Sequence, residues 1–223
     1  MQHHLTCLTQ ISHLFIVAGY PTLGKSSSLW RAAQTGFPLF GEENGPVVPK
    51  ADDLGDIGEH SSTDEKLKAG FWLTQSDLPS LAKQSQLPKL LILHLDLLLA
   101  YLLHRERVPP AIGPGEFATV FDRLFTHPAL RRYEKCTVTT LYSPIDEVQR
   151  RWRHRYPTGI PPNSGRIVKA KDRLITDELV AGPLYAALHV AWERCLASLM
   201  RNGKLAGHLK ARSRLEADLP DSR

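Results

Sequence analysis

The sequence predicts a three-layer α/β/α fold with a mainly parallel β-sheet. Three short apolar segments have the composition of β-strands, and helix-compatible segments separate them along the chain: residues 14–18, 89–96 and 136–142. Strands that alternate with helices are typical of parallel sheets, because each crossover helix returns the chain to the same edge. With 223 residues the chain is long enough to bury one substantial core. We therefore expect a single domain over residues 1–200, followed by a charged tail over residues 201–223.

The first strand, Leu14–Ala18, leads through a Gly-containing turn into a helix expected from about Lys25 to Gln34. Residues 36–70 are rich in Gly, Pro and acidic residues and show no steady periodicity. We expect them to form an irregular acidic insertion, either a solvated surface loop or a functional segment.

The later elements follow from periodicity and from residues that cap helices. We expect helices over Ser76–Ser85 (capped by Asp77 or Ser76), Glu116–Phe125, from Ser143-Pro144 to Tyr156, and over Leu174–Leu199, with strands over Lys89–Asp96 and Cys136–Tyr142. Gly182-Pro183 could split the last helix. Residues 158–173 read as a mobile basic loop.

Composition favours a cytoplasmic protein without a membrane span. The three cysteines, Cys7, Cys136 and Cys195, are too few and too widely spaced for a disulfide framework or a zinc site. The most apolar segment, Leu90–Leu103, is interrupted by His94 and Asp96 and is short for a bilayer.

The net charge of +5 conceals a strong asymmetry. Residues 42–65 contain eight acidic residues and a single Lys, whereas residues 123–173 contain twelve Lys or Arg and four acidic residues. A basic second half suits an anionic ligand such as a nucleotide. Nucleic acid is a less favoured partner, since no motif with interleaved aromatic residues accompanies the charge. The oligomeric state stays open.

The most specific motif has the spacing G-x-x-x-x-G-K-S and follows the first strand directly. In this pattern, successive backbone N–H groups surround a phosphate, the Lys contacts the outer phosphates, and the Ser hydroxyl ligates a magnesium ion. The predicted phosphate-binding residues are Gly19, Tyr20, Pro21, Thr22, Leu23, Gly24, Lys25, Ser26 and Ser27. The alternative interpretation is a Gly-rich turn with Lys25 in solvent.

Two further elements could complete a catalytic site. Asp96 ends an apolar strand, where ligands gather in open α/β sheets, so it could hold magnesium together with Ser26. Otherwise Asp96 caps a helix or lies on the surface. Arg150 and Arg151 could stabilise the transferred group as part of an Arg-rich lid over residues 150–173, or they could belong to a solvated basic face.

The Walker A segment Gly19–Ser26 and the later block Thr137–Arg150 resemble P-loop kinases of the nucleoside-monophosphate and small-molecule kind. The resemblance covers the order of elements over most of the chain, but only the Walker A motif in it is specific. It implies the P-loop nucleoside triphosphate hydrolase fold, ATP or another nucleoside triphosphate, Mg²⁺, and a small-molecule acceptor. Lys25, Asp96, Arg150 and Arg151 would then be the catalytic residues.

A second resemblance competes with the first. Gly19-Tyr20-Pro21 and the following hydroxyl residues are similar to the sulfate-donor loop of sulfotransferases, which use 3′-phosphoadenylyl sulfate. Those enzymes have Thr or Ser in place of Lys25, and their 3′-phosphate-binding residues are not matched at Tyr142, Ser143 and Arg150. The chain also resembles transferases of bacterial surface-polysaccharide synthesis. The favoured prediction is an ATP-dependent phosphotransferase, and the remaining alternative is a nucleotide-dependent switch without turnover.

Overall fold

The computed structural model describes residues 13–25, 61–68, 73–85, 87–95 and 114–212. Within them, five strands form one sheet in the order β2-β3-β1-β4-β5, and every pair of neighbours is parallel. The strands are β1 (His13–Gly19), β2 (Leu73–Thr74), β3 (Leu90–His94), β4 (Lys135–Tyr142) and β5 (Leu205–Arg212). The predicted α/β class with a parallel sheet is confirmed.

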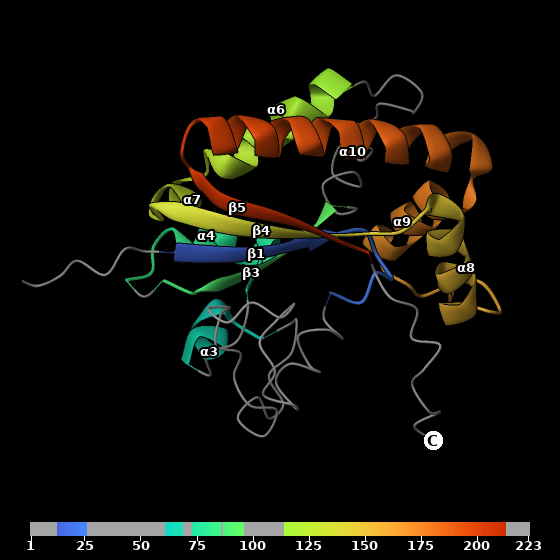
Figure 1. Cartoon of the computed structure of the whole chain (residues 1–223). Helices are drawn as coiled ribbons and strands as arrows, with labels where there is room; N and C mark the ends of the chain where they lie inside the picture. Colours follow the sequence, from blue (N-terminus) through green and yellow to red (C-terminus); the bar gives the residue numbers. More distant parts are fainter. Residues whose placement is uncertain (1–12, 26–60, 69–72, 86, 96–113, 213–223) are drawn as a thin grey trace, which may run out of the picture.

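Helices lie on both sides of this sheet and at its two ends (Figure 1). The long helix α10 (Glu178–Arg201) and α6 (Pro114–Phe125) cover one face, and α3 (Thr63–Lys68) lies on the opposite side. Helices α8 (Ile145–Arg155) and α9 (Arg166–Thr176) lie at the carboxyl end of the strands. Two short helices, α4 (Leu78–Leu81) and α7 (Pro128–Arg131), lie toward the other end.

The core lies between the sheet and the two covering helices. Strands β1 and β3 bury almost every side chain, as expected for central strands of a parallel sheet. Trp192 of α10 is fully buried, with its ring centroid 5.0 Å from that of Phe121 of α6. Its indole N–H donates to Thr140 Oγ1 of β4 at 2.9 Å. This bond fixes α10 on the sheet, because a buried N–H is costly to leave without an acceptor.

Three predicted helices have different boundaries in the structure. The helix expected over Ser76–Ser85 is a 3₁₀ turn, η2 (Gln75–Asp77), followed by the single turn α4. The helix expected over Leu174–Leu199 is the end of α9 plus α10, and Pro183 lies inside α10 without dividing it. The helix predicted to open at Ser143 begins at Ile145, with Pro144 as its N-cap residue.

The predicted charged tail is wrong for residues 205–212, which form the edge strand β5. The segment Leu-Ala-Gly-His-Leu-Lys-Ala-Arg has few β-branched residues, so local propensity does not reveal it. Pairing with β4 decides its conformation, from Cys136↔Leu205 to Tyr142↔Arg212, with one register shift at Cys136/Thr137.

Several predictions lie outside the described residues: most of the helix from Lys25 to Gln34, residues 36–60 of the acidic insertion, and residues 213–223. Residues 63–68 of that insertion form α3. None of the described helices has the length and apolar character that crossing a bilayer requires.

Candidate functional site

The segment from Gly19 to Lys25 leaves β1 at the centre of the sheet. After β1 the chain continues to β2 on one side, whereas after β4 it continues to β5 on the other side. The carboxyl ends of β1 and β4 therefore form the topological switch point, where ligands bind in open α/β sheets. We call residues 19–25 the β1 loop.

The backbone of the β1 loop has two unusual requirements. A Cβ atom on Gly19 would lie 3.0 Å from the carbonyl oxygen of Leu141, so β1 and β4 approach too closely here for a larger residue. Thr22 and Gly24 adopt φ values of 61° and 75°, in the left-handed region that Gly tolerates best. These turns fold the loop back over the end of β1.

Lys25 is buried, with 5% of its surface exposed. Its Nζ donates to the carbonyl oxygens of Gly19 at 3.0 Å and Tyr20 at 2.6 Å. The alternative of a solvent-exposed Lys25 is therefore wrong. In addition, Thr22 Oγ1 is buried and has no hydrogen-bond partner among the described residues. A buried ammonium and a hydroxyl without a partner, in a loop at the switch point, fit an anionic ligand such as a phosphate.

The apolar residues of the β1 loop have a packing role. Tyr20 and Leu23 are 0% and 1% exposed. The Tyr20 ring packs edge-on against Tyr185 of α10, with 4.9 Å between centroids and an interplanar angle of 87°. These two predicted binding residues could therefore contact a ligand only through their backbone atoms.

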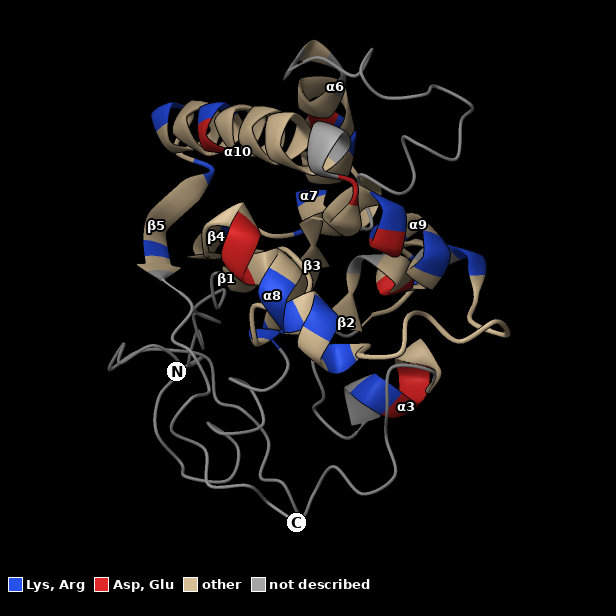
Figure 2. Cartoon of the chain, turned by 90° about the vertical axis from the view of Figure 1, so that its right-hand side faces the viewer, with Lys and Arg blue, Asp and Glu red and all other residues tan. Residues whose placement is uncertain are grey.

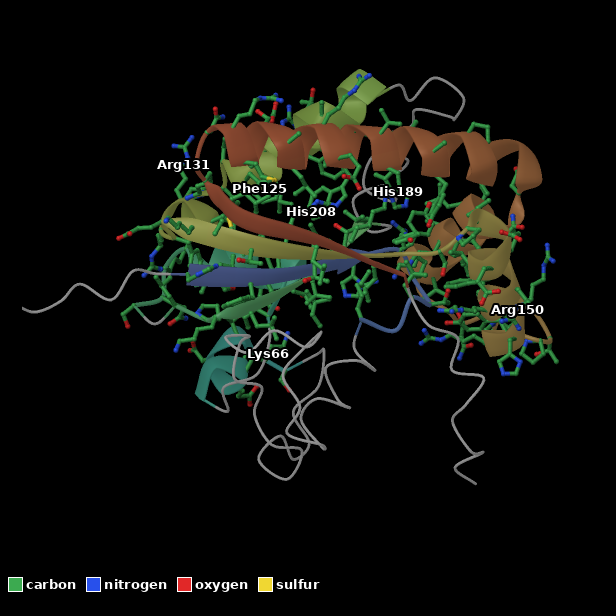
Figure 3. The ribbon with its side chains drawn as sticks, in the orientation of Figure 1. Lys66, Phe125, Arg131, Arg150, His189 and His208 are labelled. Atoms are coloured by element: carbon green, nitrogen blue, oxygen red, sulfur yellow. The ribbon has the colours of Figure 1, made fainter. Side chains whose placement is uncertain are left out.

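Helix α8 directs one of its two candidate arginines to the β1 loop. Arg151 Nη1 donates to the carbonyl oxygen of Thr22 at 3.2 Å, and 14% of its side chain is exposed. The Arg150 side chain is 59% exposed and points outward at the carboxyl edge (Figure 3). The structure thus brings Arg151, and not Arg150, to the loop.

Glu147 holds both arginines. Its carboxylate accepts two bonds from Arg150, at 2.8 and 2.9 Å, and one from Arg151 Nε at 2.7 Å. The two hydrogen bonds from Arg150, together with the one from Arg151, lower the pKa of Glu147 to about 2. In the sequence, the spacing of Glu147 to Arg150 (i,i+3) and to Arg151 (i,i+4) already indicates these ion pairs on one side of the helix.

Tyr185 of α10 also contacts this site, through the ring of Tyr20, and it was not predicted from the sequence. Its hydroxyl donates to the carbonyl oxygen of Ser143, in the turn between β4 and α8. The β1 loop is therefore connected to α8 through Arg151 and to α10 through the Tyr20–Tyr185 contact. We call Thr22, Glu147, Arg151 and Tyr185 the loop frame.

The predicted metal site cannot be built from the described residues, because Ser26 and Asp96 both lie outside them, as does the predicted phosphate-binding residue Ser27. Within the part of the chain that is described, no three His, Cys, Asp or Glu side chains converge in a way that could hold a metal ion. The predicted basic loop over residues 158–173 is wrong for residues 166–173, which belong to α9. Helix α9 packs on α8, so much of the expected lid is helical.

No protein-family model, curated protein or solved structure matches the chain. The residues themselves define an α/β protein with a candidate anion-binding loop at the centre of a parallel sheet.

Proposed function

We propose that this protein binds the phosphates of ATP or a related nucleoside triphosphate at the β1 loop and transfers a phosphoryl group to a small acceptor. The observation that carries the proposal is the buried Lys25 ammonium, held over the end of the central strand by two loop carbonyls. Phosphate oxygens are stronger acceptors for an ammonium than neutral carbonyls, so an anion can take over these bonds.

The chain's own residues have distinct roles in this proposal. ATP would supply the transferable phosphoryl group, and Mg²⁺, which Ser26 and Asp96 would hold, would neutralise phosphate charge. Lys25 binds the outer phosphates. Arg151, which donates to the carbonyl oxygen of Thr22, holds the loop and is the α8 arginine placed to stabilise charge that develops there. Arg150 contributes through the shared Glu147 rather than by contact.

The sulfate-donor alternative is less well supported by the same contacts. Tyr20-Pro21, its main sequence argument, has a packing explanation, because the Tyr20 ring lies against Tyr185. Ser143, at a position expected to bind the 3′-phosphate, is 3% exposed, and Arg150 is bound by Glu147.

Ligand-dependent thermal stabilisation tests the proposal. Mg-ATP is expected to raise the melting temperature of the wild type and of Lys135→Met, whose Lys lies exposed at the start of β4. The increase should disappear in Lys25→Met. A shift that survives in Lys25→Met would overturn the proposal, and stabilisation by 3′,5′-bisphosphoadenosine but not by Mg-ATP would favour the sulfate donor.

Turnover separates an enzyme from a switch. We expect the wild type to form ADP slowly from Mg-ATP by phosphoryl transfer to water, and to form ADP and phosphorylated acceptor faster when an acceptor is present. Lys25→Met should form neither. Binding of Mg-ATP without any ADP formation across a panel of acceptors would favour the nucleotide-dependent switch.

A further inference from the structure

The outer surfaces of α8 and α9 present a group of cations at the carboxyl edge of the sheet. On α9, Arg166, Lys169 and Arg173 are all exposed, and their spacing of i, i+3 and i+7 places them on one face. On α8, Arg153 and Arg155 are exposed near the end of the helix. Figure 2 shows the Lys and Arg positions along both helices at the carboxyl edge of the sheet. We call these five residues the α8–α9 cationic surface.

This surface has little acidic compensation. Residues 150–173 contain eight Lys or Arg and one acidic residue, Asp172. The Asp172 carboxylate accepts a hydrogen bond from Trp152 Nε1 at 3.0 Å, and Glu147 is bound by Arg150 and Arg151. Across the described residues, no carboxylate forms an ion pair with a member of the surface. Uncompensated like charges repel one another and create a positive potential that attracts anions.

The cations are held on a fixed scaffold. Helices α8 and α9 are joined by the Trp152–Asp172 bond and by Gln149 Nε2, which donates to the carbonyl oxygen of Ile175 at 2.8 Å. Arg155 lies 5.7 Å from the centroid of the Tyr156 ring. Arg151 ties the same helix to the β1 loop. The surface therefore lies on a pair of joined helices, one of which contacts, through Arg151, the loop in which we place the phosphates.

We propose that the α8–α9 cationic surface binds an anion that carries several phosphate or carboxylate groups, and that this anion is the acceptor. The second half of this proposal rests on the function proposed above. Four of the five cations are Arg, whose planar fork matches both phosphate and carboxylate oxygens. The aromatic residues of α8 and its end are Trp152, which is buried, and Tyr156, which is half-buried beside Arg155. The surface thus lacks the exposed rings on which bases of single-stranded nucleic acid stack.

Calorimetric titration of the full chain tests the binding step. The probes are inositol hexakisphosphate for clustered phosphates and citrate for clustered carboxylates, so the stronger of the two identifies the preferred group. The variant Arg153→Gln/Lys169→Gln/Arg173→Gln should weaken binding of that probe about tenfold or more. The matched control Arg123→Gln/Arg131→Gln/Lys135→Gln removes the same charge from exposed residues of α6, α7 and the start of β4. Arg131 lies at the opposite end of the molecule from Arg150 (Figure 3).

The control variant should change probe affinity less than twofold. An equal loss in the two triple variants would overturn the proposal, because net charge alone would then explain binding. Tighter binding of a single-stranded oligonucleotide than of either probe, lost in the α8–α9 variant, would also overturn it.

The Lys25→Met variant separates this inference from the function proposed above. We expect it to keep its affinity for the preferred probe while it loses the thermal shift with Mg-ATP. If Mg-ATP does not shift the melting temperature of the wild type but a probe binds, the phosphotransferase and the acceptor role are contradicted, and the anion-binding surface stands. If neither probe binds but the Mg-ATP shift is normal, the anion-binding surface is contradicted, and the phosphotransferase stands.

Discussion

Among the described residues, two buried lysines, Lys25 and Lys66, donate to different kinds of oxygen. Lys66 is 2% exposed, and its Nζ donates to both oxygens of Asp77, at 3.0 and 3.1 Å. Lys25 is 5% exposed and donates to the backbone carbonyls of Gly19 and Tyr20. A carboxylate is an ionic partner, whereas a carbonyl is a neutral one that phosphate can replace.

Asp77, the partner of Lys66, accepts further hydrogen bonds from other elements. Its carboxylate also accepts bonds from Thr63 Oγ1 at 3.2 Å and from the backbone N–H and hydroxyl of Thr74, at 2.8 and 3.0 Å. Asp77 thus joins α3 to the end of β2. It is the N-cap residue of α4, as predicted, but its side chain makes no cap hydrogen bond there. We infer that the Lys66–Asp77 pair serves stability and that Lys25 serves binding.

The largest effect is expected for Lys66→Met. This substitution leaves a buried carboxylate without its cation, which costs about 3–5 kcal/mol of unfolding free energy. Urea denaturation measures it, with Lys83→Met, at an exposed lysine, as the control. A loss no larger than that of the control would contradict the structural role of this pair.

Acid should destabilise the folded protein through His189 of α10. His189 of α10 lies between that helix and the sheet (Figure 3), and burial lowers its pKa to about 4, with the nearby Lys210 acting in the same direction. In the unfolded chain His189 has its ordinary pKa of 6.5, so between pH 6.5 and 4 the unfolded state binds this proton more tightly than the folded state. The free energy of unfolding is therefore highest above pH 6.5 and falls by up to about 3 kcal/mol toward pH 4.

Urea titrations at several pH values measure this loss. His189→Gln should flatten the curve in that window, whereas His154→Gln, at an exposed position, should not. Because the folded-state pKa of Glu147 is about 2, its contribution should disappear only at lower pH, below about 4.5. If the pH dependence of the unfolding free energy is unchanged in His189→Gln, His189 is not the group responsible for it.

Lys25→Met should have a smaller effect on stability than Lys66→Met. It leaves two loop carbonyls without this donor, and an unsatisfied buried acceptor costs about 1–3 kcal/mol. Denaturation of the two variants side by side measures the difference. Equal losses would remove the distinction between a lysine for stability and a lysine for binding.

The smallest effect is expected for Tyr185→Phe, which removes one hydroxyl and keeps the ring against Tyr20. The lost bond to Ser143 should cost about 1 kcal/mol and reduce the thermal shift with Mg-ATP, because the turn that leads to α8 loses an anchor. Tyr156→Phe, at the C-cap position of α8, is the matched control. A normal shift in Tyr185→Phe would show that the loop frame does not depend on this bond.

The parts of the fold that depend on local patterns were predictable. Strands β1, β3 and β4 are apolar or β-branched runs, and α6 and α8 have clear periodicity or capping residues, so each appears near its predicted place. Strands β2 and β5 were missed because one has two residues and the other has weak β propensity. Helix α9 was missed because its cations resembled a solvated loop.

The candidate site divides in the same way. The spacing of the β1 loop identified Lys25 as the central residue, but periodicity could not distinguish Arg150 from Arg151, since the two are adjacent on a helix. The distinction depends on which of them faces Thr22, 129 residues earlier in the chain. Tyr185 had no local signal, because its partners Tyr20 and Ser143 come from other elements.

The sequence by itself determined the α/β class, the central strand and the loop that follows it, since apolar runs, Gly positions and the Gly-Lys pair act over a few residues. The tertiary structure alone decided the strand order, the pairing of β5 and the partner of each buried charge. Such contacts join residues far apart in the chain, and their free energy depends on burial and hydrogen-bond geometry that only the folded chain creates.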